Sequence, residues 1–222
     1  MSLKVYLSGS TQENNVGVGS YGTEEIRMQS LGDMVVWYII QGKGDILCYR
    51  NYGSMSLAQT IADSNNIAPD IHVALHSNAG GGAGTECYYS NYPIYSEKGH
   101  RLAQLIYDAV APITVSNDRG CQPDTNLYNI GLAETRDTTA KACLIEIMFH
   151  DNIVDVEDYL SNNKDNVIAL AIAKAIYNYF GIEYYVAPPV ITPPTEKTEK
   201  EKVIEYVDSQ NGWDMLLRTF NL

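Results

Sequence analysis

A run of apolar residues at positions 142–149 constrains the fold more than any other feature of the chain. It reads Ala-Cys-Leu-Ile-Glu-Ile-Met-Phe, and Glu146 is its only charged member. Successive side chains of a strand point to opposite faces, so a strand that is apolar at successive positions is covered on both sides. The run therefore predicts a strand at the centre of a sheet, buried on both faces.

Shorter strand patterns alternate with helical patterns along the rest of the chain. Strands are expected at residues 4–7, 45–49, 71–75 and 86–89. Helices are expected from Glu24 to the glycines at 42–44 and at residues 56–65, 97–110 and 165–180, whereas residues 113–130 look irregular. Thr23 and Ser56 are expected to cap the first two helices. This alternation predicts an α/β fold with a twisted, mostly parallel sheet flanked by helices on both faces.

Composition divides the 222 residues into a domain and an appendage. Residues 1–182 are enough for one domain with a substantial core. Residues 183–202 are rich in proline, glutamate and lysine and are interpreted as a linker. Residues 203–222 are too short to fold alone. They are expected to be either a helical segment that docks on another copy of the chain, giving a homo-oligomer, or a fragment of a further module.

Charge and cysteine usage exclude several classes of protein. The net charge of −12 disfavours nucleic acid as a partner, because phosphate binding needs a basic face. The sequence contains no run of 18 apolar residues, so no membrane span is expected. Residues 1–7 lack the apolar core of a signal peptide. The four cysteines form no Cys-x-x-Cys pair, so a structural zinc site is not expected. A reduced protein made in the cytoplasm is the simplest interpretation.

Polar side chains follow the strand patterns at three places: residues 8–12, 76–78 and 150–152. Ligands of α/β sheets bind outside the carboxyl ends of the strands. If the strands are parallel and adjacent, His76, Glu146 and His150 converge there. Glu24, at the start of the first helix, is expected near the same edge.

Two histidines and two carboxylates suit a catalytic zinc ion, which takes three protein ligands and leaves one position for water. A separate carboxylate can then move the proton of that water. Glu146 points to function, because a carboxylate in an apolar run is costly unless it is paired or near a metal. Alternatives remain for the others: His76 as a core histidine, Glu24 as a partner of the helix dipole and His150 as a capping residue. His72 and His100 are interpreted as structural or exposed.

Residues 71–79 (IHVALHSNA) and 143–152 (CLIEIMFHDN) resemble the zinc amidases of the N-acetylmuramoyl-L-alanine amidase 3 family. Thr23-Glu24 and Gly84-Thr85-Glu86 also fit, and the likeness covers residues 4–182. The resemblance implies hydrolysis of the amide bond between N-acetylmuramic acid and L-alanine in bacterial peptidoglycan. It implies a Zn²⁺ cofactor held by Glu24 and His76, with Glu146 as the catalytic residue.

One motif departs from the family. Where the family places Asp-Pro-Gly-His after the first strand, this chain reads Ser8-Gly9-Ser10-Thr11, and the first histidine ligand is missing. The stretch resembles a branch of the family with a Ser-Pro-Ser-x-Gln loop, with Gly9 in place of the proline, and with a histidine at position 150, where other members usually have an apolar residue. A histidine lost at one strand end and gained at a nearby one suggests that His150 supplies the third zinc ligand. Gln12 is the alternative, with an amide oxygen that is a poorer zinc donor than imidazole.

The resemblance also suggests substrate contacts and a biological setting. Arg136 matches an arginine of the family that precedes the catalytic strand, and it is expected either to position substrate or to form a surface salt bridge. Asn78 is a second candidate for substrate binding. A wall hydrolase without a signal peptide, followed by a linker and a second segment, suggests a phage or prophage endolysin, made in the cytoplasm and released at lysis. The further module that residues 203–222 could begin would then be a wall-binding one. The alternatives are an inactive relative that only binds peptidoglycan and a zinc peptidase that cuts its peptides.

Overall fold

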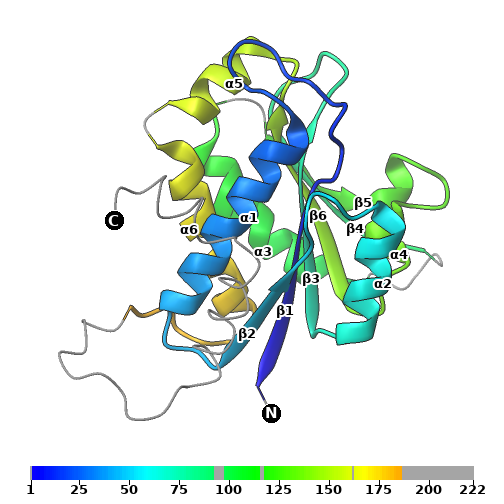
Figure 1. Ribbon diagram of the computed structural model, residues 1–222, viewed down its shortest axis with the longest axis vertical. Coiled ribbons are helices and arrows are strands. Elements are labelled where there is room, and N and C mark those ends of the chain that lie inside the picture. The colour runs from blue at the N-terminus through cyan, green and yellow to red at the C-terminus, as the bar shows by residue number, and fades with distance from the viewer. Residues whose placement is uncertain (1, 93–97, 116–117, 162, 187–222) are drawn as a thin grey trace.

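A six-stranded sheet with helices on both faces forms the centre of the protein (Figure 1). The structure, a computed structural model, describes residues 2–92, 98–115, 118–161 and 163–186. Along the sheet the strands follow the order β2-β1-β3-β6-β4-β5. Their bounds are β1 Leu3–Gly9, β2 Ile46–Arg50, β3 Ile71–Asn78, β4 Thr85–Tyr89, β5 Asp118–Pro123 and β6 Lys141–Phe149.

The strand directions confirm the predicted mostly parallel sheet. Strands β2, β1, β3 and β6 run parallel to one another, so their carboxyl ends meet at one edge. Strand β4 pairs with β6 in the antiparallel sense, and β5 is parallel to β4. The apolar run therefore lies between β3 and β4, in the interior of the sheet.

The helices form a thick layer on one face and a thin layer on the other (Figure 1). The thick layer holds α1 (Glu24–Gln41), α3 (His100–Val110) and α6 (Lys164–Tyr179). Helices α1 and α3 pack on the strands, and α6 packs on both of these helices. The thin layer holds α2 (Leu57–Ile67) and the short α4 (Ala133–Arg136). Helix α5 (Ile153–Leu160) follows β6 and packs on α6, and single 3₁₀ turns occupy Ala111–Ile113 and Asp124–Asn126.

Local sequence signals explain where the helices begin. The Thr23 hydroxyl accepts a hydrogen bond from the backbone amide of Ile26 and caps α1 as predicted. Ser56 and Gln59 form a reciprocal capping box at α2, also as predicted for Ser56.

Three elements were not predicted: β5, the four-residue helix α4 and α5. Strand β5 contains a glycine and ends in proline, and it pairs only with β4 at the edge of the sheet, where such residues are tolerated. The eight residues of α5 are too few to show a clear helical period.

The core is asymmetric about the sheet. The inward residues of β6 toward the thick layer, Cys143, Ile145 and Ile147, belong to the main hydrophobic cluster. On the other face Leu144 packs only with Ala74 and Tyr88 beneath Leu132. The next residues on that face of β3 and β6 are His76 and Glu146, so a candidate functional site lies directly beyond this small apolar cluster.

The fold continues past the predicted domain boundary at residue 182 to Val186. The backbone amide of Lys43 donates to the Tyr185 carbonyl at 2.9 Å, and the Tyr184 hydroxyl donates to the Tyr38 carbonyl at 3.0 Å. The rest of the predicted linker, the segment 203–222 and its expected self-association lie outside the described residues. Among the described helices none is long and apolar enough to cross a membrane.

Candidate active site

The carboxyl ends of β3 and β6 bring two of the predicted site residues together. His76 and Glu146 are register partners on adjacent parallel strands, so their side chains project from the same face. This is the face that carries α2 and α4. Glu24, the first residue of α1, reaches the same place after a loop that the Thr23 cap terminates. The predicted convergence of Glu24, His76 and Glu146 is therefore seen in the structure.

Glu24 and His76 are in direct contact. Oε1 of Glu24 lies 2.8 Å from Nδ1 of His76, and Nδ2 of Asn15 donates to Oε2 of Glu24 at 2.7 Å. Both Glu24 and His76 are buried. Burial by itself would raise the pKa of Glu24, but the hydrogen bond and charge of His76 lower it below its ordinary value. The carboxylate is thus held ionised next to the imidazole.

The side-chain amide of Gln12 completes a three-residue cluster. Nε2 of Gln12 lies 3.4 Å from Nδ1 of His76 and 3.5 Å from Oε1 of Glu24. Asn15 donates to Oε1 of Gln12 at 2.9 Å, which ties the amide to the same loop. The nitrogen and oxygen of such an amide are exchanged by a half-turn of the group. Gln12 can therefore turn either a donor or an acceptor towards His76 and Glu24.

On its other side the His76 ring meets Glu134 of α4. Nε2 of His76 is 3.4 Å from Oε2 of Glu134, and Oε1 of Glu134 is 3.2 Å from Nε2 of His72. Burial alone would lower the pKa of His76, but the hydrogen bonds to Glu134 and Glu24 raise it well above its ordinary value. Burial would raise the pKa of Glu134, but hydrogen bonds to His72 and His76 hold it far below its ordinary value.

Glu146 is placed differently from the other two carboxylates. Its Oε2 atom is buried and has no hydrogen-bond partner in the part of the chain that the structure describes. Burial raises the pKa of Glu146 to about 7; the charge of His76 lowers it, and those of Glu24 and Glu86 raise it further. A carboxyl group with a pKa near neutrality can both accept and donate a proton, as general acid–base catalysis requires.

Glu86 flanks Glu146 from the opposite strand. The two residues are register partners in the antiparallel pair of β4 and β6. Glu86 accepts hydrogen bonds from Nδ2 of Asn78 at 2.5 Å and Nε2 of Gln122 at 3.2 Å, and it pairs with Nε of Arg119 at 3.1 Å. Glu86 is therefore paired and hydrogen-bonded, whereas Oε2 of Glu146 has no hydrogen-bond partner among the described residues.

His150 does not join this cluster. Its Nδ1 atom lies 2.9 Å from both the hydroxyl and the carbonyl oxygen of Ser77, and its ring stacks on Tyr21 at a centroid distance of 5.8 Å. Successive residues of a strand face opposite sides, so Ser77 holds His150 on the side away from His76. Across the described ranges, no three His, Cys, Asp or Glu side chains are arranged to hold a metal. The expected convergence of His150 with His76 is therefore not seen.

Arg136 also has other partners. Its guanidinium forms two hydrogen bonds of 2.6 Å with the carboxylate of Asp137 and one of 3.1 Å with the carbonyl of Ile130. The side chain is 21% exposed. This geometry is the salt bridge that the sequence analysis gave as the alternative to a substrate contact.

A pocket of about 490 Å³ opens over the cluster. Its floor is polar and its wall next to α4 is apolar. The lining includes Gln12, His76, Asn78, Glu134, Leu132 and Glu146. The exposed side chains of Leu127 and Tyr128 form the outer wall.

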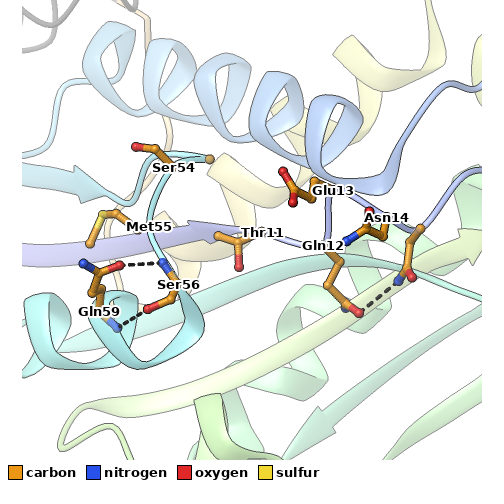
Figure 2. Close-up of a pocket in the computed structure, with 10 residues that line it drawn as sticks. Thr11, Gln12, Glu13, Asn14, Ser54, Met55, Ser56 and Gln59 are labelled. Atoms are coloured by element: carbon orange, nitrogen blue, oxygen red, sulfur yellow. Dashed lines mark hydrogen bonds between the residues drawn. The ribbon is translucent and has the colours of Figure 1, made fainter.

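A second pocket of about 470 Å³ adjoins the first, and the two share Thr11 and Gln12. Figure 2 shows that it lies between the loop after β1 and the turn before α2. Hydroxyl and amide groups dominate its lining, together with Glu13. The two pockets meet at Thr11 and Gln12, one with a mixed apolar and polar lining and the other with a polar lining, which suits an elongated substrate.

Two buried residues of the cluster, His72 and Glu134, were not predicted as parts of the site. A signal for them exists in the sequence. His72 and His76 alternate onto one face of the same strand, and two buried imidazoles on one face need an acidic partner. The partner could not be identified, because Glu134 lies in a segment with no helical or strand period.

Comparison with known proteins shows which family and which folds the chain is similar to. The family described as N-acetylmuramoyl-L-alanine amidase matches residues 9–178. Among solved structures, the catalytic domain of the amidase CwlV from Bacillus (Paenibacillus) polymyxa is 20% identical, with a TM-score of 0.70 over 82% of this chain and 99% of that one. An N-acetylmuramoyl-L-alanine amidase from Clostridium difficile 630 is 19% identical, with a TM-score of 0.69 over 81% and 97%. The catalytic domain of the CD27L endolysin, which targets Clostridia difficile, is 20% identical, with a TM-score of 0.61 over 79% and 97%. No curated protein matches the chain.

Proposed function

The chain belongs to the N-acetylmuramoyl-L-alanine amidase family, and on this premise we propose that it is a zinc-dependent hydrolase of bacterial peptidoglycan. The bond cleaved is the amide between the lactyl group of N-acetylmuramic acid and L-alanine. The observation that carries the proposal is the buried Oε2 atom of Glu146, which has no partner among the described residues and lies beside His76 in the pocket.

The donors around His76 fit a zinc ion. Zinc in proteins takes imidazole nitrogen and carboxylate oxygen at about 2.0–2.2 Å and prefers four ligands. Nδ1 of His76 and Oε1 of Glu24 already lie 2.8 Å apart, so a small movement makes room for an ion between them. Gln12 is the third donor within 3.5 Å of both, and it stands beside the position where the family has a histidine. We therefore assign Glu24, His76 and Gln12 as the ligands, in place of His150.

Glu146 carries the proton during hydrolysis. Its carboxylate takes a proton from the attacking water as the oxygen of that water forms a bond with the lactyl carbonyl carbon. The same proton then passes to the alanine nitrogen as the carbon–nitrogen bond breaks. When bound, zinc polarises the carbonyl and makes the water more acidic. The products are a free lactyl carboxylate and a peptide with an amino-terminal L-alanine.

The pocket walls suggest how the two halves of the substrate are placed. A sugar ring has apolar faces that pack on aromatic and aliphatic side chains, and the wall at Leu127 and Tyr128 offers such a surface. A stem peptide has amides that need hydrogen-bond partners, and the second pocket beyond Gln12 offers them (Figure 2). This arrangement puts the muramoyl–alanine bond over Glu146.

The proposed setting is a phage or prophage endolysin acting on the cell wall. The support is the likeness in fold to an endolysin catalytic domain. The net charge of −12 gives little attraction to an anionic wall, so specific contacts in the pocket must select the substrate.

Digestion of purified cell walls tests the proposal. Wild type should release peptides with a new amino-terminal L-alanine, measured by mass spectrometry, and should lose this activity with chelator. Glu146→Gln should bind zinc but release no product. New amino-termini at any other peptide bond would instead identify a peptidase, and cleavage by Glu146→Gln at the wild-type rate would refute the mechanism.

The second candidate is a metal-free relative that binds peptidoglycan without cutting it. Thr11, which stands where the family has its first histidine ligand, favours this reading because a hydroxyl is not among the usual zinc ligands. Elemental analysis of the full chain distinguishes the two candidates. One zinc per chain together with product release supports the hydrolase, whereas wall binding by protein free of zinc supports the binder.

A further inference from the structure

Glu134 bridges the two histidines of β3. One carboxylate oxygen lies 3.2 Å from Nε2 of His72, and the other lies 3.4 Å from Nε2 of His76. Glu134 is 4% exposed and His72 is fully buried. A buried carboxylate that meets two imidazoles is held in one orientation, because turning it would break both contacts.

The segment that carries Glu134 is itself anchored. Oδ2 of the buried Asp124 accepts hydrogen bonds from the Thr135 hydroxyl at 2.6 Å and from the Leu132 amide at 3.1 Å. The Thr138 hydroxyl donates to the Glu134 carbonyl at 2.9 Å. These bonds fix the backbone on both sides of Glu134 over the pocket.

His72 is fixed from the far side. Its Nδ1 atom lies 2.9 Å from the Ser64 hydroxyl of α2, and its ring stacks on Tyr6 at 5.2 Å with an interplanar angle of 13°. Both ring nitrogens of His72 are therefore engaged, one by Ser64 and one by Glu134. His72 therefore has no free lone pair with which to bind a metal, and its contact on the side of the pocket is with Glu134.

We propose that Glu134, supported by His72, is a positioning residue that fixes the ring orientation and the tautomer of His76. The inference rests on the proposed function, since it assigns Nδ1 of His76 to zinc. A hydrogen bond from Nε2 to Glu134 keeps the proton of the imidazole on Nε2 and turns the lone pair of Nδ1 towards Glu24 and Gln12. Metal-binding histidines commonly donate their second nitrogen to a carboxylate in this way.

Glu134→Gln tests this role, because an amide can donate to Nε2 of His76 and so favour the wrong tautomer. The full chain is titrated with zinc against a competing chelator. Loss of an outer partner typically weakens metal binding about 10–100-fold, and this weakening is the expected result. Glu134→Asp keeps the charge but is one methylene shorter, and it should give an intermediate loss.

Ring ¹⁵N spectra of His76 supply a readout that does not depend on hydrolysis. The chain has four histidines, so their ring signals can be assigned by single substitutions. In zinc-loaded wild type, His76 should carry its proton on Nε2 and its metal on Nδ1. In Glu134→Gln the Nε2 proton should exchange faster with water in the metal-free and the zinc-loaded protein alike, because the carboxylate that accepts it is gone.

Asp155→Asn is the matched control. Asp155 is also a buried carboxylate, and it accepts hydrogen bonds from the backbone amides of Gly84 and Phe149, away from the His76 ring. It should lower stability but leave zinc affinity and the His76 signals unchanged. An equal loss of zinc affinity in Asp155→Asn and Glu134→Gln would overturn the positioning role, because general loosening would then explain both.

A second variant guards against misfolding of Glu134→Gln. His72→Gln leaves Glu134 in place and removes one of its two imidazole partners, so zinc affinity should fall by less than in Glu134→Gln. Unchanged affinity and unchanged His76 signals in both variants would refute the proposal. Failure of wild type to bind zinc would instead refute the proposed function, and the Nε2 proton of the metal-free protein would still report whether Glu134 orients the ring.

Discussion

Replacing Glu146 by glutamine is expected to stabilise the metal-free protein while it abolishes hydrolysis. Burial, with the charges of Glu24 and Glu86, raises the pKa of Glu146 from 4.5 to about 7 against the opposing charge of His76. In the unfolded chain the carboxyl group is in water and titrates near its ordinary value. Between these two pKa values the folded state holds the proton more tightly than the unfolded state. The contribution of Glu146 to the free energy of unfolding therefore falls as pH rises from 4.5 to 7 and stays low above pH 7.

The size of the effect follows from the pKa values. At about 1.4 kcal/mol for each pKa unit, the ionised carboxylate destabilises the fold by about 3 kcal/mol above pH 7 and by nearly nothing below pH 4. Glutamine has nearly the same shape and does not ionise. Glu146→Gln should therefore exceed wild type in unfolding free energy by up to about 3 kcal/mol near pH 8 and by little near pH 4.

Urea denaturation of the full chain in chelator, followed by circular dichroism at several pH values, measures this difference. Glu86→Gln is the control, because Glu86 is paired with Arg119 and hydrogen-bonded by Asn78 and Gln122. That variant should be less stable than wild type near pH 8. A stability difference between Glu146→Gln and wild type that does not change between pH 4 and pH 8 would refute the reasoning.

Four further predictions concern the metal, its third ligand and the edges of the fold. Chelation should remove hydrolysis, and one equivalent of zinc should restore it, as measured by product release. Gln12→Ala should weaken zinc binding at least tenfold, since even the loss of a residue behind a metal ligand costs about that much. His150→Asn should lower the free energy of unfolding by about 1–2 kcal/mol and leave zinc affinity unchanged. A zinc titration in which His150→Asn weakens binding and Gln12→Ala does not would restore His150 as the ligand. Tyr21→Phe removes the 2.7 Å hydrogen bond to the Ser77 hydroxyl and should cost about 1 kcal/mol in urea denaturation. A chain ending after Val186 should cleave small soluble muropeptides as the full chain does, whereas one ending after Gly181 should melt at a lower temperature, because it lacks the Tyr184 and Tyr185 contacts.

Most of the fold could be predicted because its signals are local. The apolar run at 142–149 implied helices on both faces of the sheet, and Thr23 and Ser56 were recognisable as the capping residues of α1 and α2. The strand β5 was missed because an edge strand needs no apolar alternation. The reversed direction of β4 could not be predicted, since direction depends on how the chain returns to the sheet.

The site was predictable only in part, for a related reason. Alternation along one strand placed His72 and His76 on the same face, and parallel pairing placed Glu146 beside His76. Strict alternation would put His150 on the same face as Glu146, whereas the shift in register after His76 brings it to Ser77 on the other face. This shift could not be read from the sequence. Glu134 was hidden because its position depends on the Asp124 contacts of an irregular loop.

The position of His150 has a consequence for how this branch of the family is built. Its carbonyl accepts the Val18 amide at 2.8 Å, and its ring stacks on Tyr21, so it anchors the middle of the loop between β1 and α1. That loop carries Gln12 and leads into Glu24, the first residue of α1, and both residues contact the His76 imidazole. His150 thus holds the middle of this loop on one face of the sheet, while Gln12 and Glu24 contact His76 on the other face. Thr11, at the position of the usual histidine, and the Val18 and Tyr21 contacts of His150 thus lie in one loop. Substitution of His150 should therefore loosen this loop and lower stability rather than change zinc affinity.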